Sequence, residues 1–146
     1  MTSKTKHWTG ASRRNDWPEQ LHALIDFNFE TPFQWGTFDC SQFCIKAEQA
    51  MYDDTRWRDL IGGYKTQRGA NGRIKRAGAD SLWGLIDTRM ERLDSVKLAG
   101  RGDWIGHYTE EGESLGICLG SDFVCVHMDR GLVVLPMTEA VVAWRG

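Results

Sequence analysis

The character of the chain changes at Gly100, and this change restricts the fold more than any other feature. Before it, apolar residues recur at three- and four-residue spacing, which is typical of amphipathic helices. After it come five short segments rich in β-branched and aromatic residues, separated by glycine and acidic turns, which indicate an antiparallel meander. Helices first and strands second predict an α+β domain with N-terminal helices packed on a C-terminal antiparallel β-sheet.

A chain of 146 residues, 41% hydrophobic and 26% charged, suits one compact domain. We assign residues 1–15, which are polar, to a flexible or partner-docking arm and residues 16–146 to a single domain. The net charge of -2 gives no overall basic field, which argues against a nucleic-acid partner. Because no apolar run is long enough for a membrane span or a secretory signal, we expect the protein in the cytoplasm unless an assembly carries it out.

The segment 33–51 contains the strongest helical pattern of the chain. Asp39 has the chemistry of an N-cap, and the apolar stripe that follows consists of Cys40, Phe43, Cys44, Ala47, Ala50 and Met51. A thiol in the first helical turn lies near the positive end of the helix dipole, which favours the nucleophilic thiolate. Trp35 and Gly36 just upstream indicate a tight approach under an aromatic lid. The alternative is that Cys40 is a small buried apolar residue.

Two further helices are predicted, one after Asp16 and one after Asp80 or Ser81, the latter with an apolar stripe reaching Leu93. Between them, residues 55–78 contain seven basic residues, five glycines and one acid. This stretch could bind an anionic polymer such as nucleic acid or teichoic acid, but a solvated loop with a short helix at 65–76 is the favoured interpretation.

The four cysteines, at positions 40, 44, 118 and 125, lack the spacing of common zinc sites, so we predict no metal and no cofactor. Cys40 and Cys44 lie one helical turn apart, which is not the CxxC redox motif. In the expected second strand, Leu115 and Ile117 share one face and Cys118 the other. Gly116 is expected to leave room for a helix against the sheet.

Several of these segments together resemble the NlpC-type cell-wall peptidases, which are papain-like cysteine hydrolases. WGTFDCSQF is similar to their nucleophile motif, RGDWI to the glycine–aspartate turn before the first strand, and SLGICLG to the strand with the catalytic histidine. FVCVHMDRGLV resembles the next strand, which carries the third polar residue. The resemblance spans about residues 33 to 145, and its specificity lies in the combination of motifs. It implies a papain-like NlpC fold with Cys40 as nucleophile, supported by Trp35, Gly36, Asp39, Asp103 and Gly116.

The closest resemblance is to a small branch of this family found among tailed-phage and prophage structural proteins. The shared features are the aromatic-Trp-Gly-x-x-Asp-Cys opening, the RGD turn, the GIC strand and the Ala-Trp-Arg ending. In phages this fold is commonly attached to the tail tip. The resemblance therefore implies other tail-tip or hub proteins as partners, peptidoglycan as a further candidate, and a location in the host cytoplasm during assembly and then in the virion tail.

The sequence departs from the family at the position of the catalytic histidine, where it has Ser114. His127 matches the third residue, which normally orients that histidine. A serine hydroxyl does not titrate near neutrality and cannot act as the base that cysteine hydrolysis needs.

Three functional hypotheses follow from this departure. In the first, the protein is a structural component of a phage tail tip that has lost the hydrolytic chemistry. In the second, it is an active peptidase or amidase in which His127 or His107 serves Cys40 as base. The third is a non-catalytic module that binds peptidoglycan or a neighbouring tail protein through its tryptophans. Taken singly, each histidine is better explained as structural, His127 within the sheet and His107 facing solvent.

Overall fold

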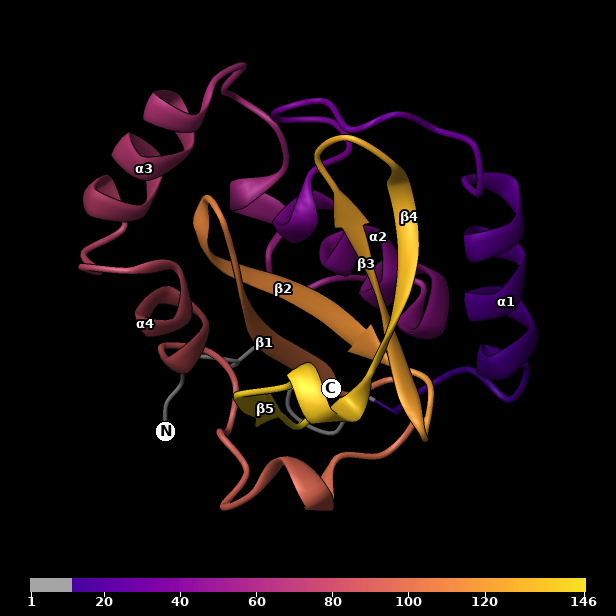
Figure 1. Ribbon diagram of the computed structural model, residues 1–146. Helices are drawn as coiled ribbons and strands as arrows, with labels where there is room; N and C mark the ends of the chain where they lie inside the picture. Colours follow the sequence, from indigo (N-terminus) through magenta and orange to yellow (C-terminus); the bar gives the residue numbers. More distant parts are fainter. Residues whose placement is uncertain (1–11) are drawn as a thin grey trace.

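Residues 12–146 are described by the structure, a computed structural model, as four α-helices followed by a five-stranded sheet (Figure 1). The α-helices are α1 (Trp17–Phe27), α2 (Cys40–Tyr52), α3 (Gln67–Arg76) and α4 (Leu82–Asp87). The strands are β1 (Trp104–Thr109), β2 (Gly112–Cys118), β3 (Asp122–His127), β4 (Gly131–Pro136) and β5 (Val142–Trp144). Short 3-10 turns are η2 (Arg58–Leu60), η3 (Val96–Leu98) and η4 (Met137–Glu139). The α+β class is confirmed, and none of the described helices could cross a membrane.

The sheet is antiparallel in the order β4-β3-β2-β1-β5. Strands β1 to β4 form the predicted meander, but β5 pairs with β1 at the opposite edge and not with β4. This part of the prediction was wrong because Trp144 on β5 is a core residue. Its ring is fully buried beside the helices, and its indole N–H donates to Asp87 at the end of α4 over 2.8 Å.

Helix α2 lies against β2 and β3 and is flanked on its other side by α1 (Figure 1). Its apolar stripe has the predicted spacing: Phe43, Cys44, Ala47 and Met51 are all fully buried. They pack in one cluster with apolar residues from the facing side of the sheet, among them Leu115, Ile117, Val124 and Val126. Burial of this face holds the start of α2 against the sheet.

The other face of the sheet carries a second, smaller core. Cys118 belongs to it, as the predicted alternation requires, together with Phe123 and Cys125 from β3. Gly116 was expected to leave room for a helix against the sheet, but none of the described helices lies there. A Cβ there would lie 2.9 Å from the Phe123 ring and 2.7 Å from the Val124 carbonyl oxygen, so the close neighbour is the adjacent strand.

Helix α4 is shorter than its apolar stripe predicted and ends at Asp87. Met90 is still buried, but the chain is extended by Leu93, whose N–H donates to the Ala143 carbonyl over 2.8 Å. Pairing with β5 therefore replaces the last expected helical turn.

Of the arm expected at residues 1–15, positions 1–11 lie outside the described residues. Positions 12–15 belong to the domain surface. The Arg14 N–H donates to the Met51 carbonyl over 2.8 Å, and the Arg13 guanidinium reaches the Arg101 carbonyl over 3.0 Å. These contacts connect the start of the described chain to both the helical half and the sheet half.

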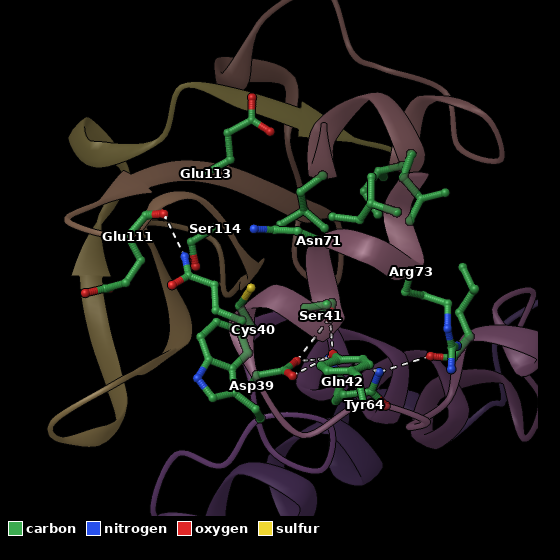
Figure 2. A pocket seen from close by; sticks show the side chains of 18 of the residues that line it. Asp39, Cys40, Ser41, Gln42, Tyr64, Asn71, Arg73, Glu111, Glu113 and Ser114 are labelled. Carbon is green, nitrogen blue, oxygen red and sulfur yellow. Dashed lines mark hydrogen bonds between the residues drawn. The ribbon is translucent and has the colours of Figure 1, made fainter. Parts of the chain in front are cut away.

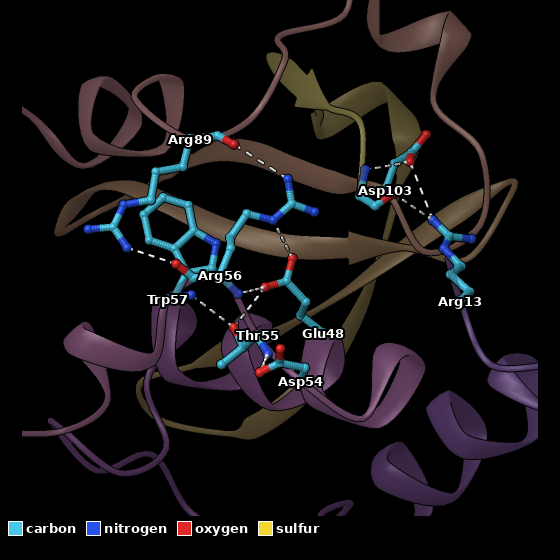
Figure 3. A network of polar contacts seen from close by, with 9 residues as sticks. Arg13, Glu48, Asp54, Thr55, Arg56, Trp57, Arg89 and Asp103 are labelled. Atoms are coloured by element: carbon cyan, nitrogen blue, oxygen red, sulfur yellow. Dashed lines mark hydrogen bonds and ion pairs between the residues drawn. The ribbon is translucent and has the colours of Figure 1, made fainter. Parts of the chain in front are cut away.

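A buried ion pair joins α2 to the segment after it (Figure 3). Glu48 is 1% exposed and accepts hydrogen bonds from the Thr55 hydroxyl (2.7 Å) and from the Arg56 N–H and Nε (both 2.9 Å). Arg56 in turn exchanges hydrogen bonds with Arg89 beyond α4. This network fixes residues 55–60, of which Trp57 and Leu60 line the pocket described below.

Replacement of Glu48 by alanine is expected to lower the free energy of unfolding by about 3–5 kcal/mol, because it leaves the buried Arg56 guanidinium without its carboxylate. Urea unfolding followed by circular dichroism measures the change. Arg58→Ala is the matched control: its ion pair with Asp54 is largely exposed, so we expect a loss below about 1 kcal/mol. Equal losses in the two variants would contradict a structural role for the Glu48 network.

Candidate functional site

The Asp39 carboxylate organises the start of α2, and Figure 2 shows it beside Cys40. The side chain is 1% exposed and accepts four hydrogen bonds. Oδ1 accepts from the Gln42 N–H (2.9 Å) and the Ser41 hydroxyl (3.0 Å). Oδ2 accepts from the Gly36 N–H (2.8 Å) and the Tyr64 hydroxyl (2.6 Å). The predicted N-cap is confirmed, and the same carboxylate also holds the preceding turn and the loop that contains Tyr64.

Gly36 allows this loop to approach closely. Its φ is +83°, and a Cβ at this position would lie 1.8 Å from the Tyr64 carbonyl oxygen. The predicted tight approach is therefore present, and its partner is the backbone of Tyr64. Trp35 is half-buried and packs edge-on against Phe33, with ring centroids 4.9 Å apart. Burial and the Asp39 charge raise the pKa of the Tyr64 phenol, so the hydroxyl remains a donor to Asp39.

Strands β2 and β3 separate beside the start of α2. Their paired residues run only from Cys118–Phe123 to Gly116–Cys125, although β2 begins earlier, at Gly112, and β3 continues to His127. Figure 1 shows the two strands diverging above this point. Cys40 lies at the opening, with the Ser114 side chain and the Leu115 backbone beside its thiol. The helix end and the split sheet together place Ser114 at the thiol.

The Cys40 thiol is not poised as a thiolate. Burial, with a smaller contribution from the neighbouring Asp39 carboxylate, raises its pKa to about 11. The polar groups of Ser114 and Leu115 beside the thiol lower the pKa, but they oppose this shift only in part. The expected thiolate-favouring effect of the helix terminus is therefore outweighed, and the thiol is protonated at neutral pH.

A pocket of about 440 Å³ opens over Cys40. Three site residues proposed from the sequence line it together, namely Cys40, Ser114 and His127, and so do Trp35 and Asp39. Its floor contains Trp57 and Trp104, whose rings stack with centroids 5.8 Å apart. Within residues 12–146, no group of three or more His, Cys, Asp or Glu side chains could hold a metal ion.

Asp103 lies away from this pocket, at the start of β1. Its carboxylate is 2% exposed and accepts from the N–H groups of Gly100 and Gly146, both over 2.8 Å. Arg13 and Arg145 lie 3.7 Å from its oxygens. Asp103 therefore fixes the turn before β1 to the last residues of the chain, and it supports the fold and not the pocket.

The two histidines differ in position. His127 lies at the end of β3, is half-buried, lines the pocket, and accepts a hydrogen bond at Nδ1 from the Asp129 N–H over 3.0 Å. His107 was expected to face solvent, but it is only 2% exposed. Its ring packs against the Phe123 ring, with centroids 4.9 Å apart. Burial lowers its pKa, and it is not a pocket-lining residue. Of the two, only His127 shares the pocket with Cys40.

Three contributors to this site were not predicted from the sequence. Tyr64 follows two glycines in a stretch without periodicity, so no pattern marks it as the partner of Asp39. Gln42 is 4% exposed and binds the Leu60 carbonyl and the Gly62 N–H, both over 3.0 Å, which its polar character did not predict. The third is α3, which forms one wall of the pocket through Ala70, Asn71 and Ile74.

The fold and the pocket define a class: an α+β domain in which a cysteine at a helix N-terminus faces a pocket beside a split antiparallel sheet. A family model described as a domain of unknown function (DUF6950) matches residues 12–146. The chain therefore belongs to the DUF6950 family. No curated protein matches the sequence.

A pKa of about 11, against an ordinary value of 9.0, makes the Cys40 thiolate about 100-fold less abundant than usual near neutral pH. Alkylation of Cys40 by iodoacetamide, followed by peptide mass spectrometry, is expected to accelerate with pH up to a midpoint near 11. Asp39→Asn should lower this midpoint and Ser114→Ala should raise it, since the two groups act in opposite directions. A wild-type midpoint at or below pH 8 would show that Cys40 is activated.

Gly36→Ala is expected to unfold the protein at lower urea concentration than Gly78→Ala. Both glycines have positive φ, +83° and +88°, so both substitutions carry about 1 kcal/mol of backbone strain. Only at position 36 does the new methyl group also meet a backbone oxygen, whereas nothing lies within 4 Å at position 78. Urea midpoints that fall equally would show that the Gly36–Tyr64 approach relaxes freely.

Proposed function

We propose that this protein is a tail-tip component of a phage or prophage with a papain-like NlpC fold that has lost most or all of its hydrolytic chemistry. Its partners are then other tail-tip or hub proteins, with peptidoglycan as a further candidate. It would be made in the host cytoplasm and incorporated into the virion tail. The tail assignment rests on the combination of motifs that the sequence shares with phage and prophage structural proteins.

One observation carries the proposal: the side chain beside the Cys40 thiol is Ser114 and not a histidine. Cysteine hydrolysis needs a group that takes the thiol proton and returns it to the leaving amine. A serine hydroxyl can hydrogen-bond to the thiol but cannot take its proton near neutral pH. The raised pKa of Cys40 agrees with this, because no imidazolium offsets burial and the Asp39 charge.

The arrangement of elements also supports the fold assignment. In the NlpC resemblance, the nucleophile opens a buried helix, the base lies on the following sheet, and the orienting residue lies on the next strand. Here Cys40 opens α2, Ser114 lies on β2 and His127 on β3, and all three side chains line one pocket. This order agrees with the one that the NlpC resemblance implies, with a hydroxyl at the position of the base.

The alternative is an active peptidase or amidase in which His127 serves Cys40 as base. The observation in its favour is that His127 lines the same pocket as Cys40. In that mechanism Cys40 attacks a peptide carbonyl, His127 transfers the proton to the leaving amine, and N–H groups at the start of α2 stabilise the oxyanion. It requires His127 to approach the thiol across the split between β2 and β3.

Incubation of purified peptidoglycan with the wild-type protein and with Cys40→Ala, at equal concentration, tests the loss of hydrolysis. We expect no release of soluble fragments by either protein, because no base contacts the thiol. Circular dichroism confirms that both are folded. Release by the wild type that disappears in Cys40→Ala would establish the alternative and overturn the proposal.

The tail assignment has its own test. Immunogold labelling of purified phage particles is expected to place the chain at the tail tip. A chain absent from mature particles but bound to tail intermediates in the host would be a transient assembly factor, which contradicts a virion component.

A further inference from the structure

Helix α3 and the residues before it concentrate positive charge on the surface. Residues 65–76 contain five basic residues and no acid, in a chain whose net charge is -2. Helix α3 has no buried residue, and Arg68, Lys75 and Arg76 are all exposed. No ion pair involves any of these five cations within residues 12–146, although other surface arginines such as Arg89 and Arg92 are paired.

Two of the exposed cations, Arg68 and Lys75, line a shallow hollow on α3. Gln67, Arg68, Asn71, Gly72 and Lys75 line it, so its rim carries amide and cationic donors and no carboxylate. Gly72 provides the space: a Cβ there would lie 3.3 Å from a guanidinium nitrogen of Arg76, which therefore folds back toward the hollow. Arg68 and Lys75 therefore line the hollow, and Arg76 lies beside its glycine.

Helix electrostatics do not explain this arrangement. Basic residues in the last turn, here Arg73, Lys75 and Arg76, stabilise the negative end of the helix dipole. Arg68, however, lies in the first turn, where a positive charge meets the positive end of the dipole. Glycine at position 72 also weakens the helix by about 1 kcal/mol relative to alanine. Both features oppose helix stability, and the positive charge of Arg68 becomes favourable once an anion lies beside it.

We propose that the hollow on α3 binds the phosphate groups of a flexible, base-free phosphodiester polymer. The cations supply charge-assisted hydrogen bonds to phosphate oxygens, and the amides of Gln67 and Asn71 supply further donors. The lining of the hollow itself contains no aromatic side chain on which a nucleobase could stack, which favours a polymer without bases over single-stranded nucleic acid. The proposal needs no hydrolysis at Cys40, although Gln67, Asn71 and Lys75 also line that pocket.

Fluorescence anisotropy with end-labelled poly(glycerol phosphate), titrated at NaCl concentrations from 20 to 200 mM, tests the site. We expect binding whose affinity falls linearly with salt on a logarithmic scale. Arg68→Gln, Lys75→Gln and Arg76→Gln should each reduce the magnitude of this slope by about 0.7, the value for one contact on a single strand. Lys97→Gln, which removes an exposed cation on η3, is the matched control and should leave the slope unchanged.

Gly72→Ala changes the shape of the hollow on α3 without changing its charge. It keeps every cation and favours the helix, but its methyl group fills the hollow beside Arg76, so we expect several-fold weaker binding. Three results would each overturn the proposal: no binding at 20 mM salt, equal effects of Lys97→Gln and the α3 variants, or undiminished binding by Gly72→Ala. Tighter binding of a labelled deoxythymidine 20-mer than of poly(glycerol phosphate) would instead identify nucleic acid as the ligand. None of these results depends on whether Cys40 hydrolyses peptidoglycan.

Discussion

The buried Asp39 carboxylate is the interaction on which the pocket depends. Its four hydrogen bonds fix the first turn of α2, the turn at Gly36 and the loop at Tyr64, which are three segments with no regular pairing between them. The position of Cys40 follows from this anchoring. The same negative charge contributes to the raised pKa of the thiol, so the group that positions Cys40 also helps to keep it protonated.

The second determinant is the separation of β2 from β3. A continuous ladder would pair the backbone of Leu115 with β3 and cover this edge of β2. Because the ladder stops at Gly116 and Cys125, the Leu115 backbone is available to Cys40, and Ser114 lies at the pocket. The apolar stripe of α2 packs across both strands beside this separation. The site is therefore a product of sheet geometry as much as of the cysteine motif.

Local patterns in the sequence predicted most of the fold. The stripe from Phe43 to Met51 defined α2, and the alternation of Leu115 and Ile117 with Cys118 correctly assigned the faces of β2. The errors arose where distant segments compete with local preference: extended pairing with β5 ended α4 before Leu93. At the site, the approach of Cys40 and Ser114 followed from the family resemblance, whereas the contact of Tyr64 with Asp39 joins residues 25 apart and has no local signal.

The position of β5 has a consequence for how the domain acquires its structure. Strand β1 lies inside the sheet only because residues 142–144, which come after all other strands, pair with it. Until that pairing forms, β1 presents an open edge, and the cavity that receives the Trp144 ring is unfilled. Pairing of such distant segments is slow because the chain must close a long loop first. The folding intermediate we expect therefore has an exposed strand edge beside an apolar hole, which makes it prone to self-association, and docking of three residues removes both features at once.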